Sequence, residues 1–175
     1  YCATCDGNFF RGKTVMVVGG GNTAAADAIY LSRLASRVIL VHRRYALRAT
    51  PVYHRQLAEL ENVEFVWDAT VRALHGEDGK LAAAQIEHLA DGSLETIPVD
   101  GVFVAVGTQP NTELLAGALP LDEAGYIVAD ETCATPVPGV FAAGDVRAKT
   151  LRQVVTAVAD GAVCAEQAAS YVAIC

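Results

Sequence analysis

The chain has 175 residues, of which 53% are hydrophobic and 19% charged, so it can form a buried core and extensive disorder is excluded. Its formal net charge of -7 argues against general binding to nucleic acid. No apolar run reaches the roughly 18 residues that a membrane span requires, and we expect no association with membranes.

The first cysteines form a C-x-x-C pair, Cys2 and Cys5, followed directly by Asp6. A zinc site, a structural disulfide and a redox dithiol all use such pairs. Zinc usually needs a second cysteine or histidine pair at short spacing, and neither the other cysteines nor the 4 histidines supply one. The remaining cysteines stand singly, which fits a reducing compartment better than a disulfide framework. A redox dithiol is favoured, although the motif alone does not decide.

Residues 14–18, TVMVV, are rich in β-branched side chains and predict a buried parallel strand. The sequence GGGNTA follows, and then AADAIYLSRLA with apolar residues at helical spacing. In the resulting G-x-G-x-x-A pattern, Gly19 permits the tight turn, Gly21 lets the backbone approach a pyrophosphate, and Ala24 allows close packing of helix on strand. We predict that the helix N-terminus binds a dinucleotide. The predicted contacts are Gly19, Gly20, Gly21, Asn22, Thr23 and Ala24.

A second strand is predicted over residues 37–42, RVILVH, and its end is where a Rossmann fold selects its cofactor. An acidic residue there would bind the ribose 2′-OH of NAD, but this chain has HRRYALR. Guanidinium groups bind a 2′-phosphate bidentately and are always charged. A solvated basic face is the alternative, which the position at the strand end disfavours. We therefore predict NADPH binding through His42, Arg43, Arg44 and Arg48.

The rest of the chain continues the α/β pattern and then changes character after residue 111. We expect a helix over residues 51–60, a third strand at 63–67, an antiparallel meander over 70–99 and a buried strand at 101–107. Beyond it we expect short strands of a different sheet at 125–130 and 139–144, and a long helix over 151–172 whose apolar stripe faces a core. We interpret four further residues as structural: Trp67, Cys133, Cys164 and Cys175.

The motifs YCATCDG, VVGGGNTA and HRRxxxR, in this order, resemble bacterial-type, low-molecular-weight thioredoxin reductases. VDGVFVAVGTQPNTELL resembles the return from that family's nucleotide domain to its flavin domain, and PGVFAAGDVR followed by RQ resembles its second flavin motif. A related flavoprotein that reduces a peroxidase shares the C-x-x-C pair and the glycines but uses NADH, and the arginines argue against it. Asn22 stands where acidic residues are common. The family's N-terminal FAD segment is missing and the chain begins at Tyr1, so we expect a fragment.

The resemblance implies a Rossmann-like, three-layer α/β domain with a small antiparallel meander over residues 1–111, followed by the C-terminal part of an FAD domain over 112–175. It implies that NADPH gives a hydride to FAD, that electrons pass to the dithiol, and that the dithiol reduces thioredoxin or a thioredoxin-like protein. Cys5 would lie nearer the flavin than Cys2, and Asp6 would handle protons. The implied remaining cofactor contacts are Gly107, Gly144, Asp145, Arg152 and Gln153.

We further expect a cytoplasmic homodimer with no bound metal, and we expect the chain by itself to be inactive as a reductase. The alternative function is an NADPH-binding redox sensor or regulator.

Overall fold

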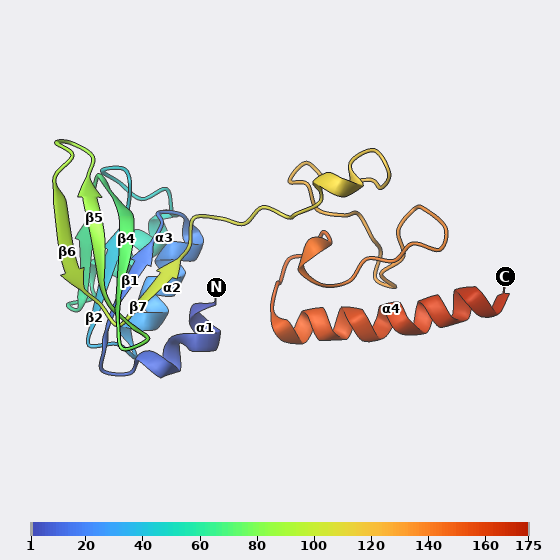
Figure 1. The fold of residues 1–175 in the computed structure, drawn as a ribbon, viewed down its shortest axis with the longest axis horizontal. Helices are drawn as coiled ribbons and strands as arrows, with labels where there is room; N and C mark the ends of the chain where they lie inside the picture. Colours follow the sequence, from blue (N-terminus) through green and yellow to red (C-terminus); the bar gives the residue numbers. More distant parts are fainter. Residues whose placement is uncertain (1, 175) are drawn as a thin grey trace. The chain divides into compact units, whose positions relative to one another are not determined.

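The computed structural model describes residues 2–174 (Figure 1). Tyr1 and Cys175 lie outside the described residues, and with them the interpretation of Cys175 as structural. The chain divides into two compact units, Tyr1–Gly107 and Thr108–Cys175. The sequence places the domain boundary after residue 111, and the assignment of the second unit to an FAD domain stays a prediction.

A four-stranded parallel sheet forms the centre of the first unit, with the strand order β3-β2-β1-β7. Its strands are β1 (Thr14–Val18), β2 (Arg37–Val41), β3 (Val63–Val66) and β7 (Gly101–Val104). The crossover helices α2 (Asn22–Ser32) and α3 (Pro51–Ala58) connect the first three strands. The predicted α/β fold is thereby confirmed, as are its strands and both helices; α3 begins at its proline, whose fixed φ suits the first helical position.

An antiparallel meander lies on the other face of this sheet and completes three layers (Figure 1). It contains β4 (Ala69–Glu77), β5 (Lys80–His88) and β6 (Leu94–Pro98) in that order. Successive side chains of a strand point to opposite faces, so Val15 and Val17 pack with the helices while Met16 packs with the meander. The predicted meander is therefore confirmed.

The N-terminal segment packs onto the first unit through short helical turns. Helix α1 (Ala3–Asp6) leads into the 3-10 turn η1 (Gly7–Phe10). Ala3 is buried in the core on the helix side of the sheet, and the ring of Phe10 meets Phe103 of β7 edge-on at 5.3 Å. The C-x-x-C pair is thus attached to the layer that carries the glycine turn.

Over residues 108–174 the second unit consists of loops, short turns and one long helix, α4 (Val154–Ile174), which confirms the helix predicted there. The prediction that its apolar stripe faces a core was wrong, because Val154, Val155 and Val158 are exposed and only Asp160 of the helix is buried. It also holds the 3-10 turns η2 (Glu113–Leu115) and η3 (Gly144–Val146). The predicted strands at 125–130 and 139–144 were wrong, because these described segments form only isolated bridges. The Asp122 and Asp130 carboxylates accept nearby backbone N–H groups and turn the chain. No helix in residues 2–174 has both the length and the apolar character to cross a membrane.

Candidate functional site

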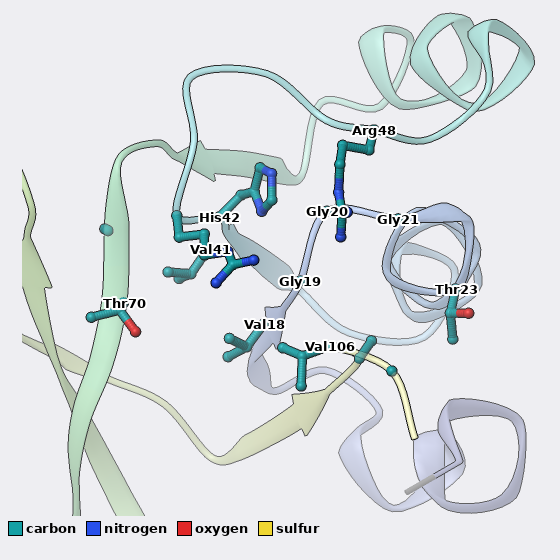
Figure 2. A pocket seen from close by; sticks show the side chains of 14 residues that line it. Val18, Gly19, Gly20, Gly21, Thr23, Val41, His42, Arg48, Thr70 and Val106 are labelled. Carbon is teal, nitrogen blue, oxygen red and sulfur yellow. The ribbon is translucent and has the colours of Figure 1, made fainter. Parts of the chain in front are cut away.

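A cavity of about 600 Å³ opens in the first unit at the carboxyl ends of β1, β2 and β7 (Figure 2). In open parallel sheets, ligands bind at the carboxyl ends of the strands, in the crevice where the order of the strands in the sheet reverses. The lining residues come from the glycine turn, the segment after β2, the start of β4 and the segment after β7. They include Gly19, Gly20, Gly21, Thr23, His42, Arg43, Arg48, Thr70 and Gly107.

The three glycines of the turn differ in what requires them. Gly19 has a φ of +149°, and a side chain there would collide with the carbonyl of Ala105. A side chain on Gly20 would overlap the ring of His42. A Cβ on Gly21, in contrast, would meet no protein atom within 4 Å. The chain itself therefore needs the first two glycines, while the third keeps space open beside the cavity.

Helix α2 begins immediately after this turn, with Gly21 as its N-cap and no capping side chain. The backbone N–H groups of its first turn therefore have no capping side chain as acceptor, and they lie at the positive end of the helix dipole. Thr23 lines the cavity, whereas the buried Ala24 packs in the core. The Asn22 side-chain oxygen Oδ1 accepts a hydrogen bond from the Thr50 backbone amide at 2.9 Å, which ties α2 to the start of α3.

The basic segment after β2 is joined to the glycine turn through the main chain, because the Arg48 amide donates to the Gly20 carbonyl at 2.7 Å. Arg43 and Arg48 line the cavity, and in Figure 2 the Arg48 side chain reaches toward Gly20. Arg44 is exposed and is not among the lining residues. The structure thus brings two of the three predicted arginines to the cavity wall.

His42 forms part of this wall and is only 4% exposed. Its ring meets Trp67 edge-on with the centroids 6.4 Å apart, and its Nε2 has no hydrogen-bond partner among the described residues. Burial lowers the pKa of the imidazole, and the positive charges of Arg48, Arg44 and Arg43 lower it further. The ring of His42 packs against the glycine turn, in the space that a side chain on Gly20 would need.

The C-x-x-C pair lies at the surface of the same unit. Cys2 and Cys5 are joined as a disulfide, and Cys2 Sγ accepts a hydrogen bond from the Cys5 amide at 3.1 Å. A hollow of about 250 Å³ beside it is lined by Cys2, Asp6, Phe9, Phe10, Val102 and Phe103. Phe9 is 73% exposed. The disulfide therefore borders an apolar hollow, and Asp6 lies on the rim of that hollow together with Cys2.

The predicted flavin residues cluster around the start of α4 in the second unit. Gly144 has a φ of +79°, and the Asp145 side chain that follows it is exposed. Arg152 donates from Nε to the Asp145 carbonyl at 3.2 Å and lies 3.7 Å over the Tyr126 ring. The Gln153 backbone amide donates to the Thr156 hydroxyl at 3.0 Å. An exposed carboxylate on a turn held by hydrogen bonds fits a polyhydroxylated chain such as the ribityl group of FAD.

Sequence reasoning missed Asp160, whose buried carboxylate accepts a hydrogen bond from the Gly144 amide at 3.0 Å. The available signal was an acid within the apolar part of the alanine-rich α4. Within residues 2–174, no group of three or more His, Cys, Asp or Glu side chains is placed to hold a metal ion.

Comparisons with known proteins relate both units to one group. The family described as pyridine nucleotide-disulphide oxidoreductase matches residues 2–161. The thioredoxin reductases of Listeria monocytogenes and Bacillus subtilis are 45% and 41% identical over 172 residues, or 98% of this chain and 54% of each relative. The chain spans about half the length of the curated relatives it matches. The crystal structure of thioredoxin reductase from Streptococcus pyogenes is 40% identical with a TM-score of 0.91, over 100% of this chain and 57% of that one.

Proposed function

Because the chain belongs to the pyridine nucleotide-disulphide oxidoreductase family, we propose that it acts in the NADPH-dependent reduction of a protein disulfide, with thioredoxin as the partner. The observation that carries this proposal is the presence, on one unit, of a basic nucleotide-sized cavity and a surface disulfide beside an apolar hollow. The similarity to thioredoxin reductases supports the same reaction.

The cavity offers separate partners for the pyrophosphate and for the 2′-phosphate of NADPH. The unused amides at the start of α2 and the open space at Gly21 suit the pyrophosphate. Arg43 and Arg48 suit the 2′-phosphate, since both line the cavity and guanidinium groups bind phosphate bidentately. Gly107 borders the same cavity after β7. Arg44 follows Arg43 directly and adds positive charge to this edge.

The disulfide supplies the second half of the reaction once it has been reduced. One thiolate of the Cys2–Cys5 dithiol attacks a sulfur of the partner disulfide, forming a mixed disulfide and releasing a partner thiolate. The other thiolate then attacks the mixed disulfide, which re-forms the Cys2–Cys5 bond and leaves the partner as a dithiol. Asp6, on the rim of the same hollow, takes the proton of the attacking thiol and gives a proton to the departing thiolate.

FAD, when bound, supplies the two-electron step between nicotinamide and disulfide. Gly144, Asp145, Arg152 and Gln153 would contact it in the second unit.

We further propose a cytoplasmic location, which the single, unpaired spacing of the other cysteines supports, and a homodimer, which the family resemblance supports. Light scattering on the whole flavoprotein measures the oligomeric state.

Nucleotide selection tests the first half of the proposal. A charge-assisted hydrogen bond contributes about 1.5–3 kcal/mol, so replacing Arg43 and Arg48 by alanine should weaken NADPH binding at least about tenfold and leave NADH binding nearly unchanged. Titration can follow the fluorescence of Trp67, the single tryptophan, which contacts His42 at the cavity wall. Arg72→Ala is the control, because Arg72 pairs with Glu87 and neither residue lines the cavity. Equal wild-type affinities for NADPH and NADH would overturn the proposal.

Thiol chemistry tests the second half. We expect the Cys2–Cys5 pair to titrate between disulfide and dithiol near the potential of thioredoxin, about −270 mV. In the whole flavoprotein, Asp6→Asn should slow electron transfer to thioredoxin and leave flavin reduction nearly intact, which stopped-flow measurement of the two half-reactions separates. Stoichiometric zinc at the pair, or a pair that never oxidises, would contradict this assignment.

A further inference from the structure

Asp160 holds a buried charged cluster in the second unit and is itself only 7% exposed. Its Oδ2 accepts hydrogen bonds from the Gly144 amide at 3.0 Å, Arg147 Nε at 2.9 Å and Lys149 Nζ at 2.8 Å. Its Oδ1 accepts a further bond from Arg147 Nη2 at 3.0 Å. Every donor comes from the short segment 144–149, while the carboxylate comes from the second turn of α4. One side chain thus fastens that segment to the helix.

The charge balance makes this cluster dependent on the carboxylate. Hydrogen bonds from Arg147 and then Lys149 hold the pKa of Asp160 well below its usual range, and these effects exceed the opposing effect of burial. The same contact raises the pKa of Arg147. A neutral residue at position 160 would leave two cations in a site with little solvent, and unpaired buried charges are strongly unfavourable.

The fastened segment contains the turn that carries Asp145. On one side of Asp145, the Gly144 amide is bound to Asp160. On the other side, the Asp145 carbonyl accepts the bond from Arg152, whose guanidinium is stacked on Tyr126. The Asp145 backbone is therefore held from both directions, while its side chain remains exposed.

We propose that Asp160 is a positioning residue that fixes the turn Gly144–Val146 and so presents the Asp145 carboxylate to a polyhydroxylated ligand. The identity of that ligand as the ribityl chain of FAD rests on the proposed function above. Asp160 touches no ligand in this role and acts through Gly144 and Asp145.

The first experiment measures the turn itself in the full chain, independently of any flavin. Hydrogen exchange of the Gly144 amide should be at least about tenfold faster in Asp160→Asn than in the wild type, because the amide loses a charged acceptor. Glu166→Gln is the matched control, an exposed acid on the same helix, and should leave this exchange unchanged. If Asp160→Asn fails to fold, Lys149→Gln removes one donor and should accelerate the exchange to a smaller extent. Unchanged Gly144 exchange in the folded variants would overturn the proposal.

The second experiment uses the whole flavoprotein and separates positioning from general stability. FAD dissociation is measured for Asp160→Asn, Asp145→Ala and the double variant. If Asp160 acts through Asp145, the rate of FAD dissociation from the double variant should stay within about twofold of the rate for Asp145→Ala, because the effects of residues that act as a unit are not additive. Fully additive effects would overturn the positioning role. A wild-type flavoprotein without FAD would instead contradict the proposed function, and the Gly144 exchange would still decide the role of Asp160.

Discussion

The two units of this chain are organised by different forces. In the first, apolar side chains from three layers fill the interior, and Met16, Ile39 and Leu40 are among the largest fully buried residues. In the described part of the second, buried apolar residues are few, and the interior includes the ion pairs of Asp160 with Arg147 and Lys149. Helix α4 also exposes Val154, Val158 and Ile174.

This difference bears on how each unit holds its candidate site. The nucleotide cavity lies at the ends of strands whose positions are set by the hydrophobic core, and few of its lining residues contribute to that core. The turn that carries Asp145 is held by charged hydrogen bonds, so the same groups determine its position and the integrity of the unit. The site and the fold should therefore be separable in the first unit at lining residues that touch no other part of the protein, such as Gly21, and inseparable in the second.

Removing core volume should produce the largest difference between the units. Leu40→Ala should lower the free energy of unfolding of the first unit by about 3 kcal/mol, because Leu40 is fully buried and a cavity would remain. Urea unfolding followed by Trp67 fluorescence measures this loss. The second unit, followed by amide exchange, should be unaffected. Leu74→Ala is the control, since Leu74 is 56% exposed and its loss should cost less than about 0.5 kcal/mol. Equal losses in both units would show that they unfold together.

The same contrast explains which features the sequence could predict. The strands of the first unit carry continuous β-branched runs, and the glycine turn is encoded by neighbouring residues, so local patterns were sufficient. The segments 125–130 and 139–144 have similar apolar content, but a strand also needs a partner, and pairing is not a local property. Likewise, nothing in the sequence distinguishes the neighbouring Arg43 and Arg44, and only the structure shows that Arg43 lines the cavity. Asp160 escaped prediction because its partners lie well before it in the chain.

Acid should weaken the two units in different pH ranges. Burial and three arginines lower the pKa of His42, so the unfolded chain binds a proton near its ordinary pKa of about 6.5 and the folded unit binds it only at lower pH. The first unit should therefore lose stability as the pH falls below about 6.5. The pKa of Asp160 is lowered in the folded chain, so its contribution to the stability of the second unit is fully present above the unfolded value of about 3.9. This contribution is lost as the pH falls below that value.

Amide exchange and urea unfolding at several pH values from 7 down to about 2.5 measure this separation. His42→Gln should flatten the pH dependence of the first unit between about pH 7 and about pH 4.5, because glutamine does not titrate. The second unit should keep its wild-type pH dependence in that variant. An unchanged slope in the first unit would mean that other groups cause its acid sensitivity.

The smallest expected change in stability belongs to Gly21→Ala, and it gives the sharpest test of separability. A methyl group at this position meets no protein atom within 4 Å. Alanine is a poorer N-cap than glycine but also reduces the entropy of the unfolded chain, so the net effect should stay within about 0.5 kcal/mol. If the pyrophosphate approaches this backbone, the same methyl group should weaken NADPH binding at least about tenfold.

Gly20→Ala provides the matched comparison one residue earlier. Its side chain would overlap the buried ring of His42, so stability and nucleotide binding should fall together. Thermal unfolding and NADPH titration of both variants therefore place the boundary between fold and site at a single peptide unit. Wild-type NADPH affinity in a stable Gly21→Ala protein would show that the nucleotide does not contact this turn. Loss of NADPH affinity with unchanged stability would show that the first unit folds independently of the space at Gly21. The second unit would differ, because Asp160 both stabilises it and positions the turn that carries its candidate site.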